Sequence, residues 1–505
     1  IRANRIGVLF TSSTTARPNG GYGIQILSDT TSDPNGRAEQ NVIGGTTNAD
    51  RNIIGANGRS GIWISGTHTY TTTISSNLIG INLDSEPAFG NNGDGIRIED
   101  GAQATVIGSA NATQPLVISG NTGAGIHVRS GGGAAPSNTT ISGYAIIGLN
   151  RGGTSARPNG QEGIRISESA GNTVIGSATT DVRIGGNGGP GIWVGGGVSN
   201  VTITRAFVGV LPTGTTTFAN TGGIWFNGTA QVTMTNSTVA ANTGYDVRIR
   251  NVGSATLDGN IIGLSANGRA ALGSADAGIA VIDSTNVTIG SVNGNIIAVA
   301  NGPGIDISGT NSVSITVRAN TLGLRRDATG DAYSVAAANT GPAIRVADAT
   351  QVIIANNIIG GNSSAAGIEL SNARSITIQQ NQVGWVADPN GGINPLARPA
   401  GIGIALTNVT TATLSGNLVR LNAADGLRLT NVATATLSSN SVQTNSGDGI
   451  HLNGVNNVTI NNTNLIEQNS GDGVQVSGSS LGVVINGNRL RANAGYGVLV
   501  TDTAR

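Results

Sequence analysis

Apolar residues recur along the chain in one short phrase: a glycine, then an apolar residue, any residue and a second apolar residue. Gly23-Ile24-Gln25-Ile26 and Gly95-Ile96-Arg97-Ile98 are two examples. The first apolar residue of the phrase, here called the anchor, occurs about every 30 residues, and every 23 or 24 residues at the end of the chain. The 17 anchors are Ile24, Ile62, Ile96, Ile126, Ile164, Ile192, Ile224, Val247, Ile279, Ile305, Ile344, Ile368, Ile404, Leu427, Ile450, Val474 and Val498.

Each repeat contains three short runs in which apolar and polar residues alternate. One repeat reads Ala435-Thr436-Leu437, then Asn440-Ser441-Val442, then Gly449-Ile450-His451-Leu452. Alternation with period 2, interrupted by Gly, Asn and Ser, predicts three short strands and their turns in about 23 residues. The sequence therefore predicts an all-β parallel solenoid of about 17 coils, stacked at the strand spacing of roughly 4.8 Å.

A column of asparagines supports this register. In most coils an Asn lies two residues before the apolar residue of the strand that precedes the anchor strand. Asn tolerates the left-handed backbone of a tight turn, and stacked amides can hydrogen-bond from coil to coil. The predicted ladder begins with Asn4, Asn52 and Asn77 and resumes at Asn260, Asn295, Asn320, Asn357, Asn381, Asn417, Asn440, Asn464 and Asn488. Between these two runs the column holds Leu116, Ala145, Val182, Ala206 and Ser237, where we expect apolar packing instead.

Two segments carry a family likeness: Asn41-Val42-Ile43-Gly44-Gly45-Thr46 and Asn52-Ile53-Ile54-Gly55. With the Gly-Ile-x-Ile phrase, they resemble the right-handed parallel β-helix proteins of the pectate-lyase-like superfamily, and most closely bacterial surface β-helix repeat proteins. The likeness covers essentially the whole chain. It implies a single-domain right-handed parallel β-helix and leaves the function open.

The length of the coils divides the predicted β-helix of residues 1–505 into two parts. Over residues 1–400 every second coil carries a longer excursion, so the repeat is a double coil; residues 401–505 form compact coils of 23–24 residues. We expect the excursions to form a ridge, which is either a binding face or a set of tolerated surface loops. They are residues 8–22, 81–93, 148–161, 209–221, 263–276, 323–341 and 384–399.

Composition narrows the possible functions. The chain has no Cys and no Lys, and its 27 Arg balance 27 acidic residues. This excludes thiolate and lysine chemistry, and the neutral balance argues against nucleic-acid binding. No apolar run approaches the length of a transmembrane segment. The chain begins at Ile1 without Met or a signal segment, which indicates a mature product or an excised fragment.

Enzymes of the resembled superfamily are lyases and hydrolases of acidic polysaccharides. Their Gly-His-Gly turn is absent around His68, His127 and His451, and so is an Arg-x-Pro-x-x-Arg pattern. We assign no catalytic residue, and the sequence favours a protein that is not an enzyme.

Three acidic residues, Asp425, Asp448 and Asp472, each lie two residues before an anchor and should stack coil upon coil. Stacked carboxylates could share a Ca²⁺ ion, the one cofactor that the sequence suggests. The favoured alternative is that Asp beside Gly is an ordinary turn residue.

The outward residue after each anchor forms a second column, in which Trp, Arg and His gather. Because Trp and Arg are typical of interfaces, we predict a partner- or glycan-binding face. The alternative is that exposed strands accept aromatic residues and neighbouring loops cover them. The predicted face consists of Trp63, Arg97, His127, Arg165, Trp193, Trp225, Arg248, Arg345, Arg428 and His451.

The leading functional hypothesis is structural. An uncapped solenoid offers strand edges that promote association, so we predict an extracellular or cell-surface subunit of a filament, sheath or layer. Its expected partners are further copies of itself or other surface proteins. The second hypothesis is an adhesin rod that binds a partner or a polysaccharide, and the third is a polysaccharide lyase or hydrolase, by fold analogy alone.

Overall fold

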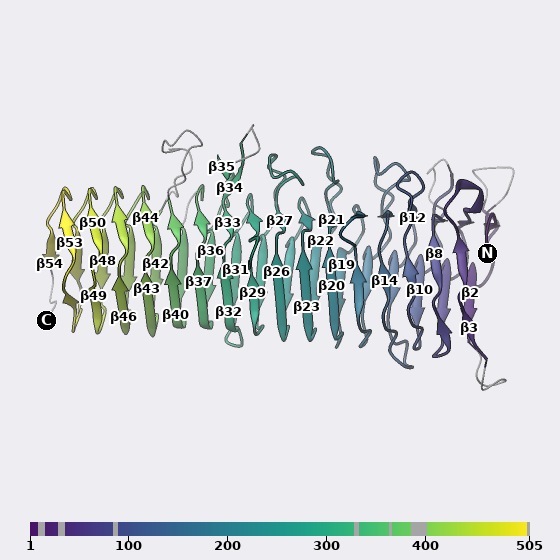
Figure 1. Ribbon diagram of the computed structural model, residues 1–505, viewed down its shortest axis with the longest axis horizontal. Coiled ribbons are helices and arrows are strands. Elements are labelled where there is room, and N and C mark those ends of the chain that lie inside the picture. The colour runs from purple at the N-terminus through teal and green to yellow at the C-terminus, as the bar shows by residue number, and fades with distance from the viewer. Residues whose placement is uncertain are drawn as a thin grey trace. The chain divides into compact units, whose positions relative to one another are not determined.

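The computed structural model describes residues 1–8, 16–28, 36–83, 89–327, 333–362, 366–384 and 401–501. The chain divides into two compact units, Ile1–Arg248 (unit 1) and Ile249–Arg505 (unit 2), and strand β25 (Val247–Arg250) contains the boundary. Within each unit, every coil contributes one strand to each of three parallel sheets (Figure 1). We number the sheets in chain order: sheet 1 contains the anchors, sheet 2 follows it, and sheet 3 precedes the next anchor.

Unit 1 has the following strands in the three sheets. Sheet 1 contains β2 (Ile24–Leu27), β6 (Ile62–Ser65), β10 (Ile96–Glu99), β13 (Ile126–Val128), β16 (Ile164–Ile166), β19 (Pro190–Gly195), β22 (Gly222–Asn227) and β25. Sheet 2 contains β4 (Val42–Gly44), β8 (Thr73–Ser75), β11 (Val106–Ile107), β14 (Thr140–Ile141), β17 (Thr173–Ile175), β20 (Asn200–Thr204) and β23 (Gln231–Thr235). Sheet 3 contains β1 (Arg5–Ile6), β5 (Ile53–Ile54), β9 (Leu78–Ile79), β12 (Leu116–Ile118), β15 (Ala145–Ile147), β18 (Val182–Ile184), β21 (Ala206–Val208) and β24 (Thr238–Val239).

Unit 2 repeats the same arrangement. Sheet 1 contains β28 (Ile279–Ile282), β31 (Ile305–Ser308), β36 (Ile344–Ala347), β39 (Ile368–Ser371), β42 (Ile404–Thr407), β45 (Leu427–Thr430), β48 (Ile450–Asn453), β51 (Val474–Ser477) and β54 (Val498–Val500). Sheet 2 contains β26 (Ser254–Asp258), β29 (Val287–Ile289), β32 (Val313–Arg318), β37 (Thr350–Ala355), β40 (Arg374–Gln379), β43 (Thr411–Ser415), β46 (Thr434–Ser438), β49 (Val458–Asn461) and β52 (Val484–Ile485). Sheet 3 contains β27 (Ile261–Ile262), β30 (Ile296–Ile297), β33 (Thr321–Leu322), β38 (Ile358–Ile359), β41 (Gln382–Val383), β44 (Leu418–Arg420), β47 (Ser441–Gln443), β50 (Leu465–Glu467) and β53 (Arg489–Arg491).

A few short elements lie outside the three sheets. Strands β3 (Ala38–Glu39) and β7 (Thr69–Tyr70) pair in parallel, and β34 (Leu324–Arg326) pairs with β35 (Tyr333–Ala336) in an antiparallel hairpin. The 3-10 helix η1 spans Asn48–Asp50. In the described ranges no helix has the length and apolar character needed to cross a membrane.

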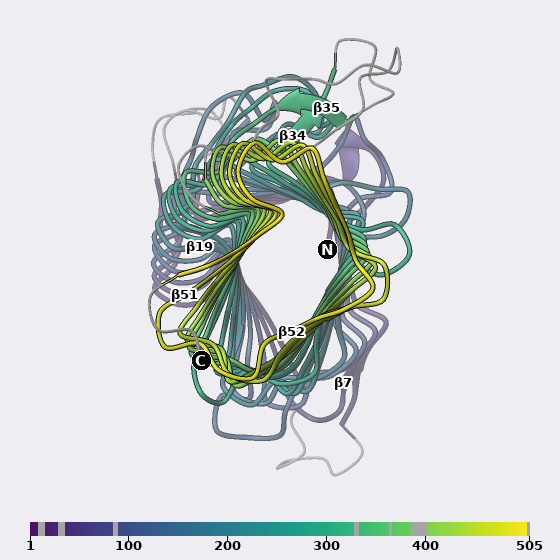
Figure 2. The same ribbon diagram turned by 90° about the vertical axis from the view of Figure 1, so that its left-hand side faces the viewer.

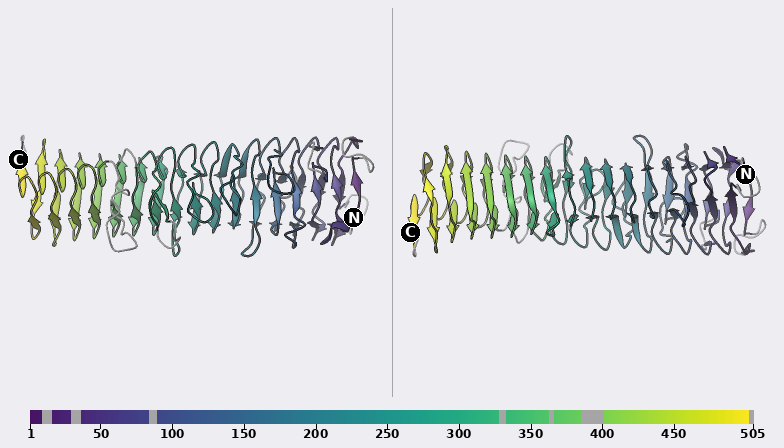
Figure 3. Two further views of the ribbon diagram at one scale, coloured as in Figure 1. Left: turned by 90° about the horizontal axis from the view of Figure 1, so that it is seen from above. Right: turned by 90° about the horizontal axis from the view of Figure 1, so that it is seen from below.

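The anchors hold the coils in register. Each of the 17 predicted anchors lies in one sheet 1 strand, which confirms the predicted coil and its three strands. Ile96, for example, pairs with Ile62 in one neighbouring coil and with Ile126 in the other, and all three side chains are fully buried. Side chains alternate between the two faces of each strand. The apolar residues of successive coils therefore stack inside, and the intervening residues lie on the outer face. Figure 2 looks along the coils of unit 2, and Figure 3 shows the stacked strands of each unit from two sides.

The predicted asparagine ladder is confirmed. Within unit 2, the side-chain amide of Asn260 donates to Asn295 Oδ1 at 2.9 Å, and the same bond continues coil by coil to Asn488. Asn4, Asn52 and Asn77 form the same ladder in unit 1. Each Oδ1 also accepts the backbone N–H of the preceding rung, so the buried amides satisfy one another.

A second ladder, which was not predicted from the sequence, lies in the turn between sheet 3 and sheet 1. Where the first ladder lapses, Leu116, Ala145, Val182 and Ala206 are fully buried, as expected. The same stretch is nevertheless bonded by amides at donor–acceptor distances of 2.7–3.1 Å. In unit 1 this ladder consists of Asn19, Asn57, Asn91, Asn121, Asn159, Asn187, Asn220 and Asn242. The coils in which the first ladder lapses are thus held by apolar packing, as expected, and also by the amide hydrogen bonds of the second ladder.

Excursions of unit 1 cover the outer face of its sheet 3. Residues Leu149 and Phe218, from two of these loops, pack against outward-facing apolar residues of the sheet. The loops close as small hairpins, with antiparallel bridges at Leu149–Ala156 and Val210–Thr217. The covered sheet residues are Ile53, Leu78, Val117 and Ile146. Parts of the predicted excursions, including 385–399, lie outside the described residues.

Candidate functional site

The outward residues of sheet 1 in unit 1 form one row, with the residues of neighbouring coils paired in register. Among the residues predicted for the binding face, those from Trp63 to Arg248 belong to unit 1, and all are half-buried. The paired row is Gln25, Trp63, Arg97, His127, Arg165, Trp193 and Trp225. Its centre reads Trp, Arg, His, Arg, Trp over five coils, a span of about 19 Å at the usual strand spacing.

At one end of the row, Trp63 is stacked and hydrogen-bonded. Its ring lies 4.7 Å from the Tyr22 ring at an interplanar angle of 20°, and Arg59 lies over Tyr22. The indole Nε1 donates to Glu99 Oε1 at 2.6 Å. These contacts fix the ring, and Tyr22 covers part of it.

At the other end, two indole rings stack with arginines and lie over glycines. The Arg165 guanidinium is 5.0 Å from the Trp193 ring centroid, and that of Arg248 is 4.1 Å from the Trp225 centroid. A Cβ atom on Gly195 or Gly222 would approach the nearer indole to less than 3.0 Å. The rings therefore occupy space that only glycine leaves open, and they extend in opposite directions along their strands.

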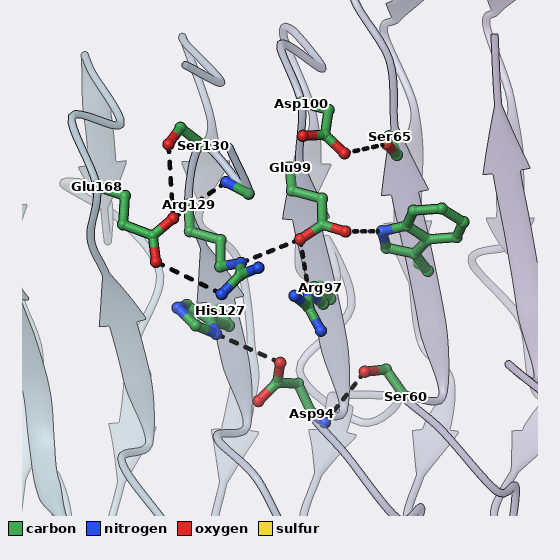
Figure 4. A network of polar contacts seen from close by, with 12 residues as sticks. Ser60, Ser65, Asp94, Arg97, Glu99, Asp100, His127, Arg129, Ser130 and Glu168 are labelled. Atoms are coloured by element: carbon green, nitrogen blue, oxygen red, sulfur yellow. Dashed lines mark hydrogen bonds and ion pairs between the residues drawn. The ribbon is translucent and has the colours of Figure 1, made fainter. Parts of the chain in front are cut away.

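Carboxylates compensate the arginines of the row (Figure 4). Glu99 accepts hydrogen bonds from Arg97 Nε at 2.7 Å and from Arg129 Nε at 3.1 Å. Arg129 also bonds Glu168, which in turn accepts the backbone N–H of Gly131. The row thus presents many hydrogen-bonding groups and little net charge.

His127, at the centre of the row, connects an acid to a hydroxyl. Its Nδ1 is 3.4 Å from Asp94 Oδ2, and its Nε2 is 3.1 Å from Ser167 Oγ. Asp94 is held in place because its other oxygen accepts the backbone N–H of Ala124 at 2.9 Å. These three residues come from three successive coils.

In unit 2 the predicted face residues separate into two groups. Arg345 forms two hydrogen bonds of 2.7 Å with Asp306, its neighbour in the adjacent coil. Arg428 and His451 pair in register further along, where Arg428 bonds Asp425 Oδ2 at 2.8 Å. The structure thus brings Arg428 and His451 together with the predicted acidic stack.

The acidic stack is a ladder from carboxylate to backbone. Asp425 accepts the N–H of Asp448 at 2.9 Å, and Asp448 accepts that of Asp472 at 2.7 Å. Burial acts to raise the pKa of Asp425, but hydrogen bonds from His451, the Asp448 N–H and Arg428 outweigh it and lower that pKa. Burial, together with the charges of Asp425 and Asp472, raises the pKa of Asp448. This geometry supports the turn role for these acids.

Histidine, not Asp472, completes the group that could hold a metal ion. One oxygen of Asp425, one of Asp448 and a ring nitrogen of His451 lie within 4.8 Å of one another. A calcium site in the Asp425, Asp448 and Asp472 stack remains a prediction. A melting temperature that millimolar Ca²⁺ leaves unchanged would contradict it.

Several partners of the row were not among the residues predicted from the sequence, above all Asp94, Glu99 and Ser167. A signal for Asp94 exists: Asp94-Gly95-Ile96-Arg97 has the same pattern as Asp425-Gly426-Leu427-Arg428. The structure also contains an open cavity of about 490 Å³ in unit 1, across the turns between sheets 2 and 3 and away from the row.

The family is established by comparison. The model of the right-handed β-helix region matches residues 180–323 and 342–505, which is more than half of the chain. The chain therefore belongs to the right-handed parallel β-helix family, and this confirms the handedness that the resemblance implied. Among curated proteins none matches this sequence significantly.

Several solved structures are similar to this chain at low identity. The A-module of the mannuronan C-5 epimerase AlgE6 from Azotobacter vinelandii is 11% identical, with 87% of this chain and 90% of that chain covered and a TM-score of 0.38. The Dettilon tailspike protein is 13% identical (72% and 62% covered, TM-score 0.38). The DFA-IIIase of Arthrobacter chlorophenolicus A6, solved in complex with GF2, is 12% identical (68% and 84% covered, TM-score 0.39). These likenesses concern the fold and carry no argument about function.

Proposed function

We propose that this chain is an extracellular carbohydrate-binding protein and that the sheet 1 row of unit 1 binds a glycan chain. The observation that carries the proposal is the placing of Trp193 and Trp225, half-buried indoles stacked with Arg165 and Arg248 over glycines. Fixed and partly exposed aromatic rings beside polar groups favour sugar binding, because sugar C–H groups meet the exposed part of the indole and sugar hydroxyls meet the polar side chains.

The charges of the row favour a neutral glycan. Arg97 and Arg129 are already paired with Glu99, and Arg165 is 3.5 Å from Glu162. A uronate carboxylate would have to displace one of these acids, whereas sugar hydroxyls can bond to both partners of an ion pair. We therefore expect neutral polysaccharides to bind more tightly than polyuronates.

A glycan array with the full chain tests the proposal. The Trp193→Ala/Trp225→Ala double variant should bind at least roughly 30-fold more weakly, the loss of about 2 kcal/mol that truncation of a central aromatic contact causes. Tyr496→Ala, which removes an exposed aromatic ring of unit 2 outside the row, serves as the matched control. Equal binding by the double variant and the wild type, with circular dichroism showing both folded, would refute the proposal.

A surface filament, sheath or layer, the leading hypothesis from the sequence, is the second candidate function. Buried amide ladders in each unit suit a protein that must persist outside a cell, and this supports either function. Electron microscopy with sedimentation velocity separates the two. Assembly into filaments or sheets would favour the structural role, and monodisperse particles would contradict it.

The lyase or hydrolase hypothesis is tested by the release of reducing sugar or of unsaturated uronates.

A further inference from the structure

His127 occupies the middle of the proposed glycan-binding row. One coil lies between it and Trp63 on one side, and one coil lies between it and Trp193 on the other. A glycan that packs on both ends of the row would therefore pass over His127 and the residues bonded to it. The inference below rests on the proposed function.

The contacts of His127 have the order of a catalytic triad. An acid lies at Nδ1 and a hydroxyl at Nε2, at 3.4 and 3.1 Å. Asp94 favours the tautomer that carries its proton on Nδ1, and this tautomer leaves Nε2 free to accept the proton of Ser167. Among the described residues, His127 is the one hydrogen-bond partner found for Ser167 Oγ. The side chains of Asp94 and His127 are only 11% and 12% exposed, so solvent competes little for this contact.

We propose that Ser167, His127 and Asp94 hydrolyse an acyl ester carried by the bound glycan. Ser167 Oγ attacks the acyl carbon while His127 Nε2 takes the hydroxyl proton. The bond between the acyl carbon and the sugar oxygen then breaks, and His127 returns the proton to the departing sugar hydroxyl. Water attacks the resulting acyl-serine, His127 accepts a proton from it, and Ser167 recovers that proton as the carboxylic acid leaves.

Arg165 supplies a donor for the negative oxygen that forms during the attack. It lies in β16, two residues before Ser167, which directly follows that strand, and the alternation of side chains places both on the outer side of the coil. Its Nε is buried and has no hydrogen-bond partner among the described residues, although the side chain is 34% exposed as a whole. An unpaired, preorganised N–H is the group that stabilises an oxyanion.

Burial limits the substrate. Ser167 is only 3% exposed, so only a small acyl group could reach its Oγ. We therefore expect acetyl, a two-carbon acyl group, to be the substrate group.

Unit 2 contains a matched control. His451 is likewise 3.2 Å from a serine hydroxyl, Ser477 Oγ, and 3.5 Å from Asp425. Ser477, however, donates its proton to the carbonyl of Leu452, and the paired row residues on either side of His451 are Arg428 and Gln475. Its hydroxyl is therefore not directed to the histidine, and no tryptophan lies beside it in the row.

The test combines labelling with hydrolysis. The full chain is treated with a fluorophosphonate probe and the labelled peptide is mapped; release of acetate is then measured from 4-nitrophenyl acetate and from an acetylated neutral polysaccharide. We expect labelling at Ser167 and a loss of hydrolysis of at least ~100-fold in Ser167→Ala. Ser477→Ala should match the wild type, and Ser167→Ala should still bind the glycan because its hydroxyl lies beneath the row.

The outcomes separate the two proposals. Glycan binding without labelling or hydrolysis overturns the triad and leaves the binding function standing. Hydrolysis that survives in Ser167→Ala also overturns the triad. Ser167-dependent hydrolysis of the small ester by a chain that binds no glycan would support the triad and refute the binding function.

Discussion

A buried asparagine in the second ladder satisfies partners in two neighbouring coils. Asn91 Oδ1 accepts both the side-chain amide and the backbone N–H of Asn57, and its own amide donates to Asn121 at 2.8 Å. Removing this side chain leaves buried donors and an acceptor without partners. This lowers the stability of the fold, because buried polar groups lose their hydrogen bonds to water on folding and need hydrogen-bond partners in the protein instead.

We therefore predict that Asn91→Ala lowers the free energy of unfolding by about 2–3 kcal/mol. The neighbouring Asn92→Ala removes an exposed amide and should change stability by less than about 0.5 kcal/mol. Urea unfolding followed by circular dichroism compares the two. Equal stabilities would show that the ladder amides contribute little.

Two acids of the C-terminal stack should respond oppositely to substitution. The pKa of Asp448 is raised in the folded chain, so ionisation destabilises the fold as pH rises through that pKa, and the effect vanishes below the ordinary carboxyl range. Asp448→Asn should therefore stabilise the chain at neutral pH by about 0.5 kcal/mol.

The pKa of Asp425 is lowered, so its contribution is present above the ordinary carboxyl range and is lost as pH falls through the folded pKa. Asp425→Asn should destabilise the chain at neutral pH by on the order of 1 kcal/mol, because it breaks the bonds from Arg428. Melting temperatures from pH 3 to 7 check both signs. If both variants raised, or both lowered, the melting temperature at neutral pH, this account of the stack would be contradicted.

At the level of the strand, glycines make room for the indoles of the row. Gly222 lies against the Trp225 ring, and its backbone is not in the left-handed region. The backbone therefore accepts alanine, but the added methyl group would clash with the Trp225 ring. We predict that Gly222→Ala weakens glycan binding roughly tenfold, or about 1.4 kcal/mol, with little change in melting temperature.

Gly21→Ala is the control for this substitution, because nothing lies within 4 Å of the added methyl group. Calorimetric titration with a glycan identified on the array measures both variants. Unchanged affinity in Gly222→Ala would mean that the position of the Trp225 ring is unimportant for binding.

At the level of elements, the strands could be predicted from the sequence more fully than the loops that pack on them. The anchors and the first ladder follow from period 2 and from a fixed Asn offset, since each coil repeats the same local geometry. The second ladder also has a fixed offset, because Asn57, Asn91 and Asn121 each lie five residues before an anchor. The packing of Phe218 on sheet 3 has no such local signal, since loop and sheet residues meet only in the folded coil stack.

The same reasoning applies to the candidate site. The row could be read from the sequence because every member follows an anchor. The partners of His127 could not, because Asp94 and Ser167 lie 33 residues before it and 40 residues after it, on different coils. Coil lengths vary, so only the structure establishes which side chains of neighbouring coils meet.

At the scale of the whole molecule, the chain is a member of the right-handed β-helix family whose two units are built alike. Both units contain an Asp-Gly-apolar-Arg strand followed, one coil later, by a histidine that contacts a serine. Only the unit 1 copy has tryptophans in its row. This difference makes unit 1 the part of the chain to which we assign glycan binding.

Tryptophan fluorescence during titration with an array-identified glycan tests that assignment most directly, because three of the four tryptophans of the chain lie in the unit 1 row. We predict a saturable change in emission with the affinity measured by calorimetry, and its loss in the Trp193→Ala/Trp225→Ala variant. Glycan binding detected by calorimetry with no change in emission, or with the same affinity in the double variant, would contradict the account.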